Sequence, residues 1–501
     1  MNWKVIGQSL RNKDMQKRIL AVLGILLIFR VLAHIPVPIG DPQTLRQVLD
    51  NVFNSQDSPQ LLSFINVLSG GALANFSIMI AGLGPYINAS IIMQLLTKAI
   101  PKLEALHKEG EFGQKKINQM TRILTFPLAI VQSIGAIYLL KDTAQRLGGL
   151  GDITAGASLM QWVLIVAAMT GGSMLLMWLG ELVTEQSLGN GISLLITVSI
   201  VSSLPASVSN LATSVYDKES NWSPFGLGLP IDPKNLAIAI AIALAVVLVT
   251  WIVVKLNEAS RNITVNYAKR IQGNRAYGGV TTKLPVKLIT AGVVPIIFAV
   301  AFLSVPGFAG QLMANSGSAR LQELGANLTL WFQNPSAATF AQPGFTPYIY
   351  PLTYFLLVFA FTFFYTSITF NAKEIAENLH KQGGFIEGVR SGPQTEKYLG
   401  KVVNRLTLFG AMCLGLLAMT PIVAQAFFSG NSMIANLALD GTAVLILVSV
   451  ALQTLRAVES RALMVTYDQY SRDDFFQDMD PDDLESPRKR RFSLLPRRKN
   501  A

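Results

Sequence analysis

Ten long apolar segments, separated by polar ones, make up most of this 501-residue chain. Each is close to the roughly 20 residues that a helix needs to cross the hydrocarbon core of a bilayer. The pattern predicts an all-α, polytopic membrane protein with ten transmembrane helices. The segments fall at 19–36, 76–99, 119–140, 160–183, 191–208, 235–255, 286–305, 350–370, 404–425 and 439–460.

Composition agrees with the membrane class. The chain is 51% hydrophobic and 14% charged, and its mean hydropathy is +0.41, whereas soluble domains carry about 25% charged residues. The first apolar segment follows Lys17-Arg18 and leads into HIPVPIG without a small-residue cleavage site. It is therefore expected to be a retained helix and not a signal peptide.

The basic residues predict an orientation. If the N-terminus is cytoplasmic, most of the 41 lysines and arginines fall in the cytoplasmic segments. Cytoplasmic loops carry such an excess, so both termini are expected inside.

The ten spans divide after the fifth into an N-terminal half, 1–208, and a C-terminal half, 235–465, joined by an external hinge loop, 209–234. Each half has an odd number of helices, so structural repeats would have to be inverted, with the working site between them near the midplane. The tail, 466–501, is acidic and then basic and is predicted to be disordered. Its basic block either binds anionic lipid or RNA or stays solvated without a specific partner.

The stretch Leu61–Leu96 is apolar but interrupted by serines, asparagines and glycines. One interpretation is a short half-helix, 64–73, that enters the protein from one face, followed by a full span from Phe76 to about Ile100. Irregular backbone at membrane depth needs protein or water around it. The alternative is a glycine-containing membrane helix with a polar lead-in.

The residues needed for catalysis or ion coupling are scarce. Cys413 is the only cysteine, and His34, His107 and His380 are scattered, so no metal site or cofactor is expected. HExxH, P-loop and paired-carboxylate patterns are absent from the sequence. Coupled transporters usually carry ionisable residues in mid-span, and here these spans hold almost none. Of a transporter, a membrane enzyme and a passive channel, the residues favour the channel.

A channel can be sealed by a ring of bulky aliphatic side chains, because a narrow apolar constriction excludes water and ions. Candidates stand beside small or helix-breaking residues, and two of the pairs are spaced i, i+4, which places each pair on one helix face. Ordinary helix packing is the alternative explanation. The candidates are Leu83, Ile87, Ile192, Ile196, Ile297 and Ile446.

Uncharged polar residues lie in the second, third and seventh spans. They would be unpaired in lipid, so they are expected to face other helices or water, most simply as packing contacts. These positions, with the bend at the proline, are Asn88, Gln94, Gln132, Ser133, Thr290 and Pro295.

Two long inside loops, 257–284 and 371–403, are large enough to dock a partner. Alternation at Ile263–Val265 suggests a hairpin in the first. The second reads as a short helix followed by turns at GGF and VRSGPQT. Positive-inside bias explains most of their charge, but Arg390 lies at a turn tip, where a guanidinium suits carboxylate or phosphate.

The outside stretch Gly307–Ile349 is expected to be a surface lid or loop.

Several long motifs carry a resemblance: SGGAL, PYINASIIMQLL, MWLGELVTEQSLGNGIS and FNAKEIAENLHKQGGFIEGVRSGPQTEKYL. Over about residues 15–465 the chain resembles the SecY family of protein-conducting channels. The resemblance implies that the aliphatic candidates form the pore ring. It also implies that the polar positions line a lateral gate, through which hydrophobic segments leave sideways. The half-helix would be the plug, made of Phe64, Ile65, Asn66, Val67, Leu68, Ser69, Gly70, Gly71, Ala72 and Leu73.

The same resemblance implies a bacterial plasma-membrane location and a set of partners. These are SecE and SecG in a heterotrimer, the SecA motor ATPase, the translating ribosome, precursor proteins with signal sequences, YidC and SecDF, and membrane lipid. Ribosome and motor would dock at Arg261, Lys269, Arg270 and Arg390. Two positions depart from the family pattern. Ile289 stands where asparagine is usual, so the resemblance carries less weight for the gate there, and Thr290 is expected to replace part of the asparagine's polar contact. Asn262 stands in place of a second arginine, which predicts weaker docking.

Overall fold

The computed structural model describes most of the chain. The described residues are 13–37, 69–73, 76–148, 158–216, 233–267, 270–272, 275–277, 279, 281–292, 294–314, 318–332, 340, 344–427 and 440–470.

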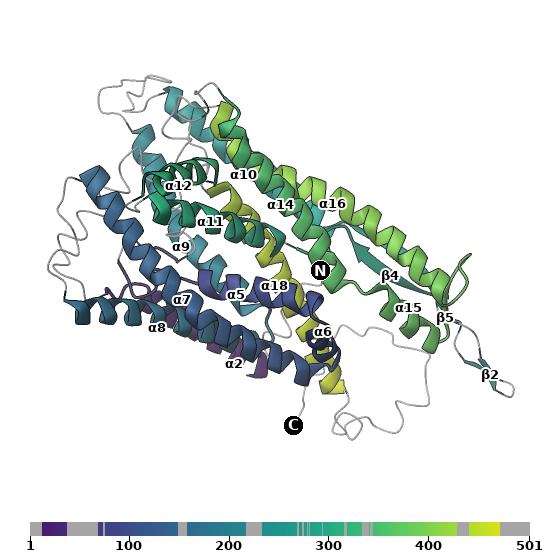
Figure 1. Ribbon diagram of the computed structural model, residues 1–501. Helices are drawn as coiled ribbons and strands as arrows, with labels where there is room; N and C mark the ends of the chain where they lie inside the picture. Colours follow the sequence, from purple (N-terminus) through teal and green to yellow (C-terminus); the bar gives the residue numbers. More distant parts are fainter. Residues whose placement is uncertain are drawn as a thin grey trace, which may run out of the picture.

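The described part is mainly helical (Figure 1). The first half contains α2 (Lys13–Leu32), α5 (Gly84–Ala99), α6 (Pro101–Lys108), α7 (Glu111–Gly148), α8 (Leu159–Glu185) and α9 (Gly191–Val215). The second half contains α10 (Pro233–Glu258), α11 (Val294–Ala314), α12 (Ala319–Phe332), α14 (Thr346–Thr369), α15 (Ala372–Lys381), α16 (Pro393–Phe427) and α18 (Asp440–Tyr470).

Each of the ten predicted spans contains a helix. Within the described ranges, six helical stretches are long and apolar enough to cross a membrane, and Gly191–Pro205 and Val294–Gly307 are shorter apolar helices. The prediction of a helical, multi-pass membrane protein is confirmed. The six stretches are Glu111–Tyr138, Leu159–Glu185, Pro233–Glu258, Thr346–Lys381, Pro393–Thr420 and Ala443–Met464.

The predicted start of the second span at Phe76 is wrong. Residues 76–83 form turns, and α5 begins at Gly84. Phe76 has a φ of 46° and Gly82 a φ of 56°, and left-handed backbone interrupts a right-handed helix. Pro85 then occupies the first helical turn, where its missing N–H has no cost.

The predicted start of the seventh span at 286 is also wrong. Residues up to Lys287 belong to strand β4 (Thr281–Lys287), and α11 begins only at Val294. Gly292, with a φ of 63°, lies in the turn between them. The apolar side chain of Val286 packs into a small core outside the spans, so apolarity alone misplaced the boundary.

The all-α prediction has an exception in the inside loops, where the described residues form a three-stranded sheet and a two-stranded sheet. β1 (Ser260–Tyr267) pairs antiparallel with β4, from Ser260 opposite Lys287 to Asn266 opposite Thr281. It also pairs antiparallel with β5 (Gly384–Ile386). A second hairpin joins β2 (Arg270–Gln272) to β3 (Arg275–Tyr277). The predicted hairpin is confirmed. The predicted turn at GGF is limited to Gly383, which has a φ of 70°, because Gly384 and Phe385 are in β5.

The outside stretch after Gly307 is not only a loop. α11 continues to Ala314, and α12 follows and packs against both α11 and α14. In Figure 1, α12 lies at one end of the helix bundle, and α15, β4 and β5 lie at the other.

Candidate functional site

The centre of the molecule is one continuous hydrophobic cluster, called here the central core. It takes residues from α2, α5, α8, α9, α10, α11, α14, α16 and α18, and so from both halves of the chain. Figure 1 shows α5, α11 and α18 in the middle of the bundle. The core therefore lies where the sequence analysis expects the working site.

All six pore-ring candidates belong to the central core. Four are buried and two are partly buried and packed against the others. They come from four helices and the turn before α5, at sequence positions more than 360 residues apart. The structure thus brings the predicted set together. The buried members are Leu83, Ile87, Ile196 and Ile446, and the partly buried ones are Ile192 and Ile297.

Close packing of α8 on α9 fixes the position of Ile192 and Ile196. The Asn190 side chain caps α9 by accepting hydrogen bonds from the backbone N–H groups of Ile192 and Ser193, a common N-cap arrangement. A Cβ at Gly191 would lie 2.0 Å from the carbonyl oxygen of Gly180. Glycine is therefore required at the start of α9.

The predicted plug is described only in its second part. Residues 64–68 lie outside the described residues, and Ser69–Leu73 form turns and not a helix. Gly70 and Gly71 have φ values of 70° and 83°, which a right-handed helix does not accommodate. Ala72 is fully buried in the central core.

Contacts from α2 and α9 hold this segment. The Arg30 guanidinium donates a hydrogen bond to the carbonyl oxygen of Gly70. A Cβ at Gly70 would lie 3.2 Å from both Phe29 Cζ and Ser199 Oγ. The described residues of the predicted plug are therefore held by specific contacts, and Ala72 shares the central core with the ring candidates.

The turn that follows the plug is fastened to the end of α2 and to α8. Val37 N–H donates to the carbonyl of Phe76, Ile78 N–H donates to that of Ile35, and Ser77 Oγ donates to that of Leu32. On the other side, a Cβ at Gly172 of α8 would lie 2.1 Å from the carbonyl oxygen of Ile78. Backbone contacts on both sides thus set where α5 begins.

Helices α5 and α7, which carry most of the predicted gate residues, pack against each other. A Cβ at Gly84 would lie 3.1 Å from Gln132 Oε1, and Gln94 Nε2 donates to Ser90 Oγ at 3.1 Å. Gln94 Oε1 and Ser133 Oγ are buried without a hydrogen-bond partner in the described part of the chain, and Asn88 is half-buried on α5. Helix α11 contacts both α5 and α7, so these helices form one polar-lined seam.

The α11 side of the seam is less polar. Ile289 is 5% exposed and belongs to the central core. Thr290 Oγ1 donates to the carbonyl oxygen of Lys287 at 3.2 Å, so its hydroxyl is used within its own turn. Pro295 is buried in the first turn of α11. These contacts do not support the prediction that Thr290 supplies the polar gate contact in place of an asparagine at position 289.

One polar contact beside the seam escaped the sequence analysis. Arg122 on α7 forms a two-pronged ion pair with Glu181 on α8, with Nε–Oε1 at 2.8 Å and Nη2–Oε2 at 2.7 Å. Such bidentate pairs are strong and geometrically specific. Opposite charges at the same end of two neighbouring spans were the signal that could have revealed it.

The two inside loops form one platform with its own core. Side chains of β1, β4, β5, α15 and α16 pack together there. The sequence predicts two separate docking loops, but the pairing of β1 with β5 joins them. The buried core residues are Ile263, Val265, Val286, Ala376, Ile386, Leu399, Val402 and Val403.

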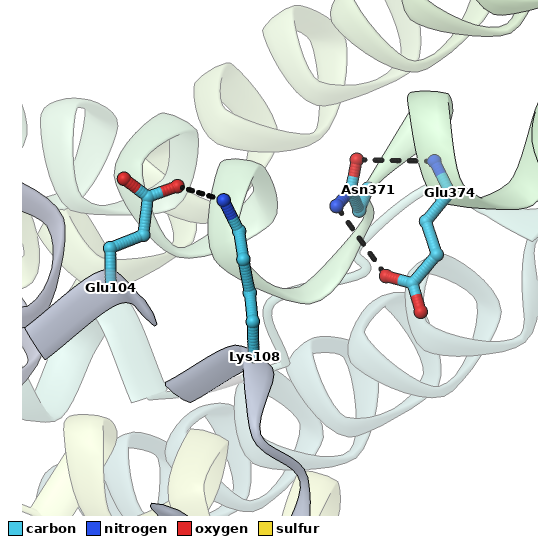
Figure 2. A network of polar contacts seen from close by, with 4 residues as sticks. All are labelled: Glu104, Lys108, Asn371 and Glu374. Atoms are coloured by element: carbon cyan, nitrogen blue, oxygen red, sulfur yellow. Dashed lines mark hydrogen bonds and ion pairs between the residues drawn. The ribbon is translucent and has the colours of Figure 1, made fainter. Parts of the chain in front are cut away.

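Short-range polar contacts lie near the ends of α15, which belongs to the platform, and of α6. Figure 2 shows Asn371 Oδ1 accepting from the backbone N–H of Glu374 at 3.4 Å, which caps α15. In the same view, Lys108 Nζ lies 2.8 Å from Glu104 Oε1 on α6. The hydrogen bond from Lys108 and its charge lower the pKa of the Glu104 carboxyl. Both helices are thus stabilised at their ends by local polar pairs.

The predicted docking residues lie on or beside the platform. Arg390 is exposed in the turn before α16, and Thr395 Oγ1 donates to its carbonyl oxygen at 3.0 Å. Arg261 is exposed on β1, and Arg270 opens β2. Lys269 lies outside the described residues. The platform therefore presents at least two arginines on an ordered base.

The fold and the site together define a multi-pass helical membrane protein with an apolar centre between two halves. Its fold matches a solved structure described as "The structure of a protein conducting channel", with a TM-score of 0.53 and 18% identity, over 87% of this chain and 91% of that one. A second match, described as a study of the plug domain of the SecY protein, has a TM-score of 0.52 and 18% identity, over 86% and 90%.

Sequence comparisons identify the family. The SecY family model matches residues 77–455. Protein translocase subunit SecY of Streptomyces coelicolor is 36% identical over 93% of this chain and 99% of its own length. The corresponding subunit of Corynebacterium glutamicum is 38% identical over 92% and 98%. The chain belongs to the SecY family.

Proposed function

We propose that this chain is the channel-forming subunit of a protein translocase. It passes unfolded polypeptides across a membrane and releases hydrophobic segments sideways into the bilayer. Its curated relatives are protein translocase subunits. The observation that carries the proposal is the gathering of the six aliphatic candidates into one core, beside the seated residues 69–73.

At rest, the aliphatic ring and the plug residues block the path. A narrow apolar constriction excludes water and ions without any charge. Aliphatic contacts are non-directional, so the ring can widen around a passing chain and hold no particular sequence. Displacing the plug requires breaking the hydrogen bond between Arg30 and the Gly70 carbonyl.

Sideways release takes place between α5 and α11, with α7 beside them. Their buried polar groups, including Gln94 Oε1 and Ser133 Oγ, are poorly satisfied in the closed state. Unpaired buried polar groups are costly, so the seam is held less tightly than a uniformly apolar interface. A hydrophobic signal segment that enters the seam replaces these helix contacts with its own.

The chain is a channel subunit and not an enzyme, so the driving force comes from partners. We place the platform and both termini in the cytoplasm of a bacterial cell, where SecA or a translating ribosome docks on Arg390 and Arg261. SecE and SecG complete the heterotrimer, and YidC and SecDF are further contacts. Residues 1–208 and 235–465 are the two halves that open about the hinge loop 209–234.

Charge reversal at Arg390 tests the docking step. An exposed guanidinium on an ordered turn suits carboxylate or phosphate, and Arg390→Glu replaces attraction with repulsion. Loss of one charged partner costs on the order of 2 kcal/mol, or more than tenfold in affinity. We therefore expect a strong drop in precursor export by vesicles containing this protein, SecE, SecG and SecA.

The matched control is Lys397→Glu, the same change of charge at an exposed site on α16. It should export precursor nearly as well as the unmodified protein, and both variants should unfold at the same denaturant concentration. Normal export by Arg390→Glu would remove Arg390 from the docking surface.

A further inference from the structure

Helices α11 and α12 form a tight antiparallel hairpin. A Cβ at Gly310 would lie 2.9 Å from the carbonyl oxygen of Gly325 and 2.9 Å from Thr329 N. A Cβ at Gly307 would lie 3.5 Å from the carbonyl oxygen of Phe332. Residues earlier in α11 therefore lie beside residues later in α12. Phe332 consequently returns to the level of Gly307, where the apolar stretch Val294–Gly307 ends.

The polarity of α12 changes along its length in the same direction. Its first turns carry Arg320, Gln322 and Glu323, whereas its last five residues, 328–332, read LTLWF and carry no charge. The charged end is thus the one farther from the apolar part of α11. This gradient is the one expected of a helix that enters an apolar layer with its C-terminal end.

Two side chains at the uncharged end of α12 are exposed in the described structure, whereas Phe332 packs against the central core. Leu330 is 60% exposed and Trp331 is 38% exposed, while Gly325 on the opposite side is buried against α11. Leu324, next to Gly325 in the sequence, is 54% exposed. Exposure of these side chains to water would be unfavourable by about 25 cal/mol for each Å² of apolar surface.

Neighbouring helices present exposed aromatic and aliphatic side chains at the same end of the bundle. At the start of α14, Phe345 is 68% exposed and Tyr348 is 54% exposed, with ring centroids 6.3 Å apart. On α11, Phe302 and Val305 are half exposed. Trp and Tyr gather where the hydrocarbon meets the headgroups. Helix α12 packs against both α11 and α14, so its exposed side chains belong to a group of helices that present apolar and aromatic side chains to their surroundings.

We propose that the C-terminal end of α12, residues 328–332, is inserted in the interfacial layer of the bilayer leaflet opposite the platform. Its partner is lipid, with the side chains of Leu330 and Trp331 among the upper acyl chains and headgroups. Interfacial helices lie about 5–10 Å into this layer. Because α12 packs on α11, one wall of the seam has a lipid contact outside the spans.

Three positions on the outward face of α12 give a depth series. Glu323, Ala326 and Leu330 are exposed and spaced i, i+3, i+7, so they share a face, and the first and last are about 10 Å apart along the axis. Single cysteines at these positions, in a Cys413→Ala background, would carry a nitroxide label. The labelled protein, purified with SecE and SecG, would be reconstituted in vesicles. The collision rates of the nitroxide with oxygen and with a water-soluble nickel chelate would then be measured.

The expected result is a ratio of oxygen to nickel collisions that rises several-fold from 323 through 326 to 330. Equal, high nickel accessibility at all three positions would mean that α12 stands in water, and the proposal would fail. Low accessibility of position 330 to both reagents would mean that protein covers it, which also overturns a lipid contact. The result does not depend on translocation activity, so it is separable from the proposed function.

Discussion

Serine at both Ile87 and Ile196 should make the resting protein leak ions. Both side chains are buried in the central core, with exposed fractions of 6% and 1%. A hydroxyl at each position removes apolar surface and offers hydrogen bonds to water, which weakens the dewetting that seals a constriction. We expect conductance in planar bilayers, without precursor or SecA, to rise several-fold.

The same helices supply matched controls. Ile92 on α5 is 38% exposed and Val201 on α9 is 46% exposed, and both lie outside the central core. Ile92→Ser together with Val201→Ser makes comparable substitutions without touching the ring. If the ring variant conducts no more than this control, Ile87 and Ile196 are packing residues and do not seal the channel.

Alanine at Gly172 should destabilise the protein. The added Cβ would lie 2.1 Å from the Ile78 carbonyl oxygen, and a backbone atom cannot turn aside as a flexible side chain can. Overpacking of this kind typically costs about 1–3 kcal/mol, occasionally more. The displaced turn would also shift the start of α5. A lower midpoint in denaturant unfolding of the reconstituted or detergent-solubilised protein is the measurement.

The adjacent glycine is the control for this substitution. A Cβ at Gly171 meets nothing within 4 Å, and alanine is a better helix former than glycine by about 1 kcal/mol. Gly171→Ala should therefore keep or slightly raise stability. Equal stability of the two variants would show that α8 does not pack on the Ile78 turn as closely as described.

Much of the fold follows from apolar segment length. Each predicted span contains a helix because roughly 20 apolar residues have few other solutions in a bilayer. The predicted helix starts were wrong where tertiary contacts or backbone conformation, and not the apolarity of the segment, determine where the helix begins. Val286 looked like part of a span but packs in the platform. The left-handed backbone at Phe76 prevents a helix there, so α5 begins later than predicted.

The sequence indicated which residues belong to the candidate site, but not how these residues contact one another. Glycine and proline pointed to Leu83, Ile192 and Ile297, and the structure places all three in the central core. The ion pair between Arg122 and Glu181 and the pairing that joins β1 to β5 could not be predicted from the sequence. These contacts join segments 59 or more residues apart, and local patterns carry no such information.

Photo-crosslinking from Ile297 tests most directly whether the aliphatic ring surrounds a translocating chain. A secretory precursor would be stalled halfway across vesicles containing this protein, SecE, SecG and SecA. Phe302, 50% exposed on the same helix, would carry the probe in the control. We expect a crosslink to precursor from 297 that requires ATP and a functional signal sequence, and none from 302. Crosslinks from 297 only to lipid or neighbouring helices, while export continues, would contradict a pore through this ring.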